Sequence, residues 1–186
     1  IHMRMFDAIG QFYPKVKRDF HAGELVLGQS IPEALRFHIR DAVKTGGANR
    51  IGHGVDISYE FNAFDTIKTM KDKGVAIEIL LTSNQQLLGV KNKKHPFPFY
   101  VKMGVPVVLA GDDPGMMRTS QTNEFFLAVT RYPVIKYRNI KQFAYNSIKY
   151  SFLGLLKKQE LKKRLDKKFK AFEAKWTKTI ETHGLL

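Results

Sequence analysis

One short stretch decides the fold: Val105-Pro106-Val107-Val108-Leu109-Ala110-Gly111-Asp112-Asp113-Pro114. Its apolar run is rich in valine, which favours strands, and it ends directly in two carboxylates. Strands that are buried on both faces of a parallel sheet have this continuous apolar character. The stretch therefore predicts a strand of a parallel α/β fold with polar chemistry at its carboxyl end.

Three earlier segments have the same form. An extended run at 16–20 leads into His21-Ala22-Gly23-Glu24, another is Arg50-Ile51-Gly52-His53-Gly54, and a third at 75–81 leads into Thr82-Ser83-Asn84. Their spacing of about 25 to 30 residues is that of one βα unit. Such repetition predicts parallel α/β architecture, in which chemistry gathers at the carboxyl ends of the strands. A doubly wound sheet obeys a similar rule, so the pattern alone leaves both arrangements open.

Helices are predicted between these strands. The first is expected to begin at Ser30, where Pro32 and Glu33 complete a capping-box pattern, and to run to about Thr45. Glycines that follow an apolar periodic segment are typical helix ends, as at Gly74 and Gly104. Four further helices are expected over residues 61–73, 96–103, 122–129 and 140–153.

The final segment, residues 155–182, is predicted to form one long amphipathic helix that ends at Gly184. An apolar stripe recurs along it at intervals of three or four residues: Leu161, Leu165, Phe169, Phe172, Trp176 and Ile180. We interpret this stripe as a packing face, with lysine and arginine on the opposite side. The whole of residues 1–186 is expected to be a single region.

The charge is strongly positive, with a net value of +14 over 186 residues. Such an excess is found in proteins that bind nucleic acid or anionic membranes. Much of it lies at 157–178, on the polar face of the last helix, so we interpret it as solvated surface and predict neither partner. No run of about 20 apolar residues predicts a membrane helix. Because cysteine is absent, any metal must be held by His, Asp or Glu.

Five polar residues at the predicted strand ends could meet in the folded protein: His21, Glu24, His53, Asp112 and Asp113. Each alone has an ordinary structural explanation, since a buried His often serves only as a hydrogen-bonding core residue. Their repetition at the same end of several strands indicates a site instead. His and Asp bind zinc when deprotonated, and an acid beside a second His suits acid–base work on an activated water.

These motifs resemble the C-terminal half of the adenosine deaminase family, within the metal-dependent amidohydrolase superfamily. The matching stretches follow in family order over about residues 16 to 155: His21-Ala22-Gly23-Glu24, Arg50-Ile51-Gly52-His53-Gly54, Leu81-Thr82-Ser83-Asn84, His95-Pro96 and Asp112-Asp113-Pro114. Two more, Asn84-Gln85-Gln86-Leu87 and Asn146-Ser147-Ile148-Lys149-Tyr150-Ser151, look closest to the growth-factor-type branch. The resemblance implies strands five to eight of a (β/α)8 TIM barrel, followed by C-terminal helices.

The resemblance also implies a cofactor, one zinc ion held by His21 and Asp112. The family takes further ligands from a His-x-His pair on its first strand, and this sequence contains no such pair. We therefore expect a complementary N-terminal half of the barrel as partner and expect this chain alone to be inactive. A fragment is the favoured interpretation, and a split enzyme or a natural truncation that pairs with itself are the alternatives.

The remaining roles are likewise implied by the resemblance. Glu24 would protonate the purine ring, and His53 would orient or deprotonate the zinc-bound water, which Asp112 also contacts. Asp113 and Gly23 would bind the substrate. His95 is expected to position a loop rather than to bind metal.

The resemblance implies hydrolytic deamination of adenosine or 2′-deoxyadenosine to inosine or 2′-deoxyinosine and ammonia by the intact protein. One alternative is a deaminase of another purine, such as adenine or AMP. A second is a non-catalytic, growth-factor-like module that binds a polyanion through the basic surface. The sequence leaves the cellular compartment open.

Overall fold

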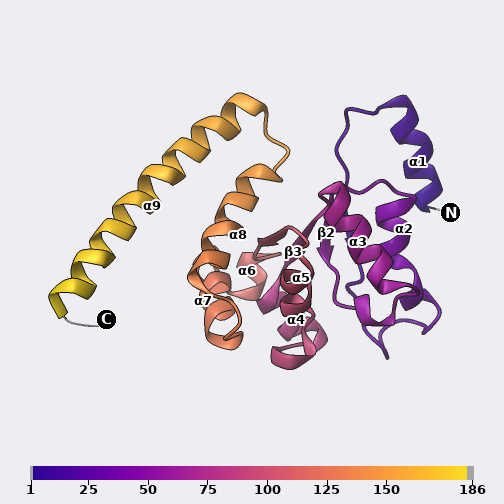
Figure 1. Cartoon of the computed structure of the whole chain (residues 1–186). Helices are drawn as coiled ribbons and strands as arrows, with labels where there is room; N and C mark the ends of the chain where they lie inside the picture. The colour runs from indigo at the N-terminus through magenta and orange to yellow at the C-terminus, as the bar shows by residue number, and fades with distance from the viewer. Residues whose placement is uncertain (1, 184–186) are drawn as a thin grey trace.

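The computed structural model describes residues 2–183, in which four parallel strands form one sheet (Figure 1). The strands lie side by side in chain order: β1 (Asp19–Ala22), β2 (Arg50–His53), β3 (Ala76–Ile79) and β4 (Val107–Leu109). A doubly wound sheet reverses its strand order at a switch point, whereas a (β/α)8 barrel adds each new strand beside the last. The sheet is therefore an arc of four consecutive barrel strands, which confirms the predicted α/β fold.

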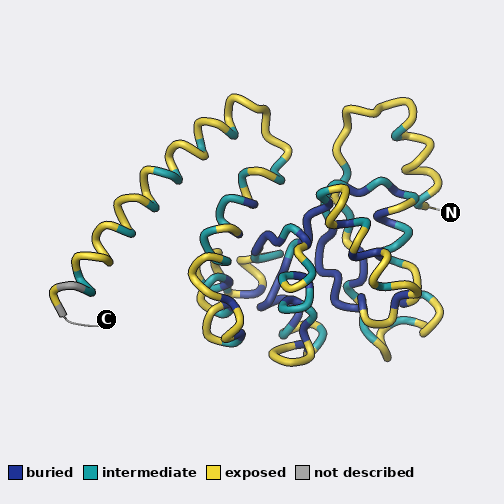
Figure 2. The backbone as a smooth tube through the Cα atoms, in the orientation of Figure 1, coloured by how far each residue is buried: buried dark blue, intermediate teal, exposed yellow. Residues whose placement is uncertain are grey.

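The two faces of the sheet carry different side chains, because successive residues of a strand point to opposite faces. One face carries apolar residues in register: Phe20, Ile51, Ile77 and Val107. This face belongs to the hydrophobic core, visible as the buried strands of Figure 2. On the other face, Arg50 forms ion pairs with Asp19 and Glu78 of the neighbouring strands.

Helices precede, separate and follow the strands. The first eight are α1 (His2–Phe12), α2 (His38–Lys44), α3 (Ala63–Lys73), α4 (Leu81–Leu88), α5 (Phe97–Met103), α6 (Pro114–Met117), α7 (Gln121–Arg131) and α8 (Tyr137–Lys149). Short 3₁₀ turns lie at Ala34–Arg36, Ile57–Tyr59 and Asn92–Lys94. Gly74 and Gly104 end α3 and α5 in the left-handed conformation, as predicted. No helix was predicted at the positions of α4 and α6.

The start of α2 differs from the prediction of a helix from Ser30. The helix begins at His38, and its free N–H groups are capped by a distant side chain. Glu60 accepts hydrogen bonds from the backbone N–H groups of Ile39 at 2.7 Å and Arg40 at 3.0 Å. The helix start predicted from the capping-box pattern was therefore wrong, because a carboxylate from another part of the chain sets where this helix begins.

Two predicted strands also have different bounds. The expected run at 16–20 begins only at Asp19, so that His21 lies within β1 rather than after it. Thr82-Ser83-Asn84, predicted at the end of a strand, forms the first turn of α4 instead. Both shifts matter for the site, because they place polar side chains on regular elements rather than on loops.

The last helix, α9 (Leu155–His183), leaves the body of the protein as a long arm beside α8 (Figure 1). The ring of Phe169 packs 5.6 Å from the ring of Tyr145 on α8. Farther along, Phe172 and Trp176 are 46% and 48% exposed, so the predicted packing face is only partly covered. Gly184, the predicted helix end, lies outside the described residues. Within residues 2–183, no helix has the length and apolar character required to cross a membrane.

Candidate active site

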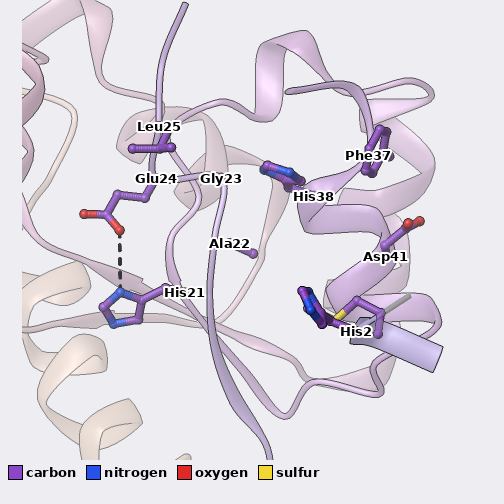
Figure 3. Close-up of a pocket in the computed structure, with 10 residues that line it drawn as sticks. His2, His21, Ala22, Gly23, Glu24, Leu25, Phe37, His38 and Asp41 are labelled. Carbon is purple, nitrogen blue, oxygen red and sulfur yellow. Dashed lines mark ion pairs between the residues drawn. The ribbon is translucent and has the colours of Figure 1, made fainter. Parts of the chain in front are cut away.

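The carboxyl end of β1 brings His21 and Glu24 face to face. The chain turns sharply after Ala22, and Oε2 of Glu24 lies 3.6 Å from Nδ1 of His21 (Figure 3). Gly23 makes this turn possible with a φ of 69°, and a Cβ there would lie 2.3 Å from Oδ1 of the buried Asp56. Only glycine fits such a position. The turn directs the Glu24 carboxylate back toward the strand.

The neighbouring strand places His53 against His21. The two imidazole rings lie edge to face with centroids 4.6 Å apart. Gly52 is paired with His21 in the register, and a Cβ at Gly52 would lie 3.0 Å from the ring of His21. His53 is fully buried and has a φ of 70°, a left-handed conformation that is uncommon for residues other than glycine.

Asp112 approaches His53 from the end of β4. Its Oδ2 lies 3.9 Å from Nε2 of His53 and accepts a hydrogen bond of 2.6 Å from Oγ of Ser83. Asp112 has a left-handed φ of 57°. Asp113, next in the chain, is exposed at the start of α6. Sequence reasoning gave Ser83 no role, although its place directly after the third strand was the available signal.

The structure thus brings together four of the five predicted strand-end residues. His21, Glu24 and His53 offer ligand atoms that all lie within 4.8 Å of one another, and Asp112 adjoins them through His53. Nε2 of His53 is buried without a hydrogen-bond partner among the described residues. Because buried polar nitrogens are normally satisfied, this atom requires a water or ligand between the carboxylates. The donor set fits a metal-dependent site.

Burial sets the charge of His53. It lowers the pKa of the imidazole, and the neighbouring His21 acts in the same direction. Glu24 and Asp112 oppose this effect without reversing it. The ring is therefore neutral near pH 7 and has one protonated and one unprotonated nitrogen.

A second polar layer lies behind His53. Nδ1 of His53 lies 3.0 Å from Nδ2 of Asn84, and Oδ1 of Asn84 lies 3.0 Å from Nε2 of His95. Burial lowers the pKa of His95 to about 4, so it too is neutral. His95 lies outside the group of possible metal ligands.

The surface beside Glu24 is hollowed. A cavity of about 430 Å³ opens at the end of β1 and is lined by residues that include His21, Glu24, Leu25, Phe37 and His38. In Figure 3, the Glu24 carboxylate and the His21 ring lie on one side of the view, and His38 and Asp41 lie on the other. Small-molecule sites commonly have volumes of about 300 to 1,000 Å³. His53 is not among the residues that line this hollow.

Comparison with known proteins gives a consistent result. The family model described as adenosine deaminase matches residues 2–168. The adenosine deaminase of Clostridium perfringens (strain ATCC 13124) is 33% identical over 146 residues, which are 78% of this chain and 39% of that protein. The chain therefore spans about two fifths of the length of this curated relative.

Solved structures share the fold. The adenine deaminase of Arthrobacter aurescens has a TM-score of 0.71 at 22% identity, covering 90% of this chain and 47% of that chain. An amidohydrolase from Burkholderia ambifaria, solved with bound Zn, has a TM-score of 0.71 at 16% identity, covering 88% and 43%. At these identities the likeness concerns the fold, and it covers less than half of each of those chains.

Proposed function

Because this chain belongs to the adenosine deaminase family, we propose that it supplies much of an active site for hydrolytic deamination of a purine. Water replaces the exocyclic amino group, and ammonia is released. The proposed substrates are adenosine and 2′-deoxyadenosine. One observation carries the proposal: His21, Glu24, His53 and Asp112 converge at the carboxyl ends of three parallel strands.

The position of each side chain supports a separate role. Glu24 lines the hollow, and its Oε2 lies 3.6 Å from Nε2 of His53, so its carboxyl group can give a proton to a ring nitrogen of a bound purine. Oδ2 of Asp112 and Nε2 of His53 lie 3.9 Å apart, so both can contact one attacking water beside them. Gly23 and Asp113 are proposed to hold the base, Gly23 because it lines the hollow and Asp113 because its side chain is exposed at the end of β4.

The proposed ligands of a zinc ion are His21, which belongs to the group of possible metal ligands, and Asp112, whose Oδ2 adjoins that group 3.9 Å from Nε2 of His53. Zinc bound there would lower the pKa of a coordinated water from 15.7 to about 7. A catalytic zinc generally has three protein ligands, so two from this chain are insufficient. We propose that the complementary N-terminal half of the barrel supplies the others and is the partner of this chain.

The test is an assay of ammonia release from adenosine, adenine and AMP. It compares this chain alone with the chain joined to the N-terminal half of the protein that contains it. The joined protein is expected to bind about one zinc and to deaminate adenosine fastest, and the chain alone to be inactive. Turnover by the chain alone at the joined protein's rate would refute the need for the partner. Zinc-loaded joined protein without any turnover would refute the deaminase.

A faster reaction with adenine or AMP would correct the substrate and leave the reaction class in place. The matched control is His38→Ala in the joined protein. His38 lines the same hollow but lies outside the group of possible metal ligands. Its replacement is expected to leave the zinc content unchanged.

A further inference from the structure

Three buried polar side chains connect a backbone amide to the proposed active site. The N–H of Phe97 donates to Nδ1 of His95 at 3.1 Å, and Nε2 of His95 lies 3.0 Å from Oδ1 of Asn84. Nδ2 of Asn84 lies 3.0 Å from Nδ1 of His53. All three side chains are buried, with residue exposures of 3% for His95 and 0% for Asn84 and His53. The far nitrogen of His53, Nε2, faces Glu24 and Asp112.

The direction of each hydrogen bond in this series follows from the first one. A backbone N–H can only donate, so Nδ1 of His95 must be the unprotonated nitrogen of that ring. The proton of the neutral His95 ring is therefore on Nε2, which donates to the carbonyl oxygen of Asn84. This fixes the Asn84 amide with its NH₂ group toward His53. An NH₂ group also only donates here, so Nδ1 of His53 is unprotonated and Nε2 carries the proton.

The reversed orientation of the Asn84 amide is incompatible with the hydrogen bond between Phe97 and His95. If the Asn84 amide were turned over, its NH₂ group would face Nε2 of His95, which would then have to be unprotonated. The proton of His95 would move to Nδ1 and point at the N–H of Phe97, so that two donors would face each other inside the core. Buried polar groups without partners are costly, because no water replaces the lost bond.

We propose that Asn84 and His95 are positioning residues that hold His53 in the tautomer with its proton on Nε2. His53 then presents an N–H donor, rather than a basic nitrogen, to the space between Glu24 and Asp112. The role of this tautomer in catalysis rests on the proposed deaminase function. His53 would orient the attacking water through a hydrogen bond. Because Glu24 is assigned to protonate the purine, the water's proton would pass to the carboxylate of Asp112.

The tautomer can be measured directly by NMR of the chain labelled with ¹⁵N at histidine, at pH 7.5. Correlations between ring nitrogens and ring carbon-bound protons distinguish a protonated Nδ1 from a protonated Nε2. The expected spectrum of the unaltered protein has His53 and His95 both protonated on Nε2. A proton on Nδ1 of His53 would overturn the proposal without any variant.

Asn84→Asp provides the sharper test. A carboxylate at position 84 can only accept, so it would draw the proton of His53 to Nδ1 while keeping the shape of the amide. The expected result is a switch of the His53 tautomer. An unchanged tautomer in folded Asn84→Asp would show that Asn84 does not control it.

The matched control is Asn146→Asp, which also replaces a buried amide. Asn146 is 5% exposed, and its Nδ2 donates to the carbonyl of Val107 at 2.8 Å, away from His53. This variant is expected to keep His53 protonated on Nε2. A switch here as well would mean that general loosening of the core, rather than Asn84, changes the tautomer.

The NMR readout does not involve turnover, so it separates the two proposals. If the chain has His53 protonated on Nε2 but the joined protein is inactive, only the deaminase function is overturned. An active one with the proton on Nδ1 would overturn only the role of Asn84 and His95.

Discussion

Oε1 of Glu60 accepts the backbone N–H of Ile39 at 2.7 Å across 21 positions of sequence. The other carboxylate oxygen accepts the next N–H, that of Arg40, so one side chain satisfies two of the free donors at the start of α2. Negative charge is also favourable at this end of the helix dipole. The start of α2 is thus fixed by Glu60, a residue that follows β2 in the sequence.

Replacement of Glu60 by alanine is expected to lower the free energy of unfolding by about 1 to 3 kcal/mol, the usual cost of leaving buried donors unsatisfied. Urea denaturation followed by circular dichroism would measure it. The control is Glu33→Ala, because Glu33 is exposed and makes no side-chain cap. Its effect should stay within about 0.5 kcal/mol. Equal losses from both variants would contradict distant capping.

His95 is expected to make the protein sensitive to acid. Burial lowers its pKa from 6.5 to about 4 in the folded protein, so the unfolded chain takes up a proton first as the pH falls. The contribution of neutral His95 to the free energy of unfolding is complete above pH 6.5. It is lost as the pH falls toward 4, by about 3 kcal/mol at most. His95→Gln should flatten this acid limb in denaturation curves taken between pH 8 and pH 4.

Asp56 changes the stability with pH in the opposite direction to His95. Burial and the nearby Glu60 raise its pKa from 3.8 to about 7, and both carboxylate oxygens lack hydrogen-bond partners among the described residues. The folded protein holds this proton more tightly, so Asp56 costs stability as the pH rises from 3.8 through 7, by about 4 kcal/mol at most. Asp56→Asn should therefore gain stability relative to the unaltered protein as the pH increases from 4 to 8. A pH-independent difference would contradict the raised pKa.

Glu24→Gln is expected to lower kcat of the joined protein by a factor of about 10² to 10⁴, the usual contribution of one acid–base group. Glutamine has the same shape but cannot transfer the proton. The zinc content, measured by metal analysis of the same sample, should not change, because Glu24 is not one of the proposed ligands. Turnover of adenosine at the parental rate would refute the role of Glu24.

His21→Ala is expected to weaken zinc binding by the joined protein at least about tenfold, since it removes one of few ligands. Titration calorimetry with zinc measures this, and His38→Ala is the control from the same hollow. Unaltered affinity in His21→Ala would exclude His21 as a ligand.

The proposed site was partly predictable from the sequence and partly not. His21, Glu24, His53 and Asp112 lie at or just after short predicted strands, and parallel strands in chain order place their carboxyl ends side by side. Ser83 and Asn84 were recognised only as part of a motif. Their partners, Asp112 and His53, lie 29 and 31 positions away, and no local pattern indicates such hydrogen bonds.

The sequence by itself determined the parallel α/β class, the ends of α3 and α5 at Gly74 and Gly104, and the residues that meet at the strand ends. Each of these depends on local preferences: apolar runs for strands and left-handed glycines for helix ends. The tertiary structure alone decided that α2 begins at His38 and that Asn84 and His95 stand behind His53. The physical reason is that a buried hydrogen bond needs a partner, and only folding determines which distant side chain supplies it.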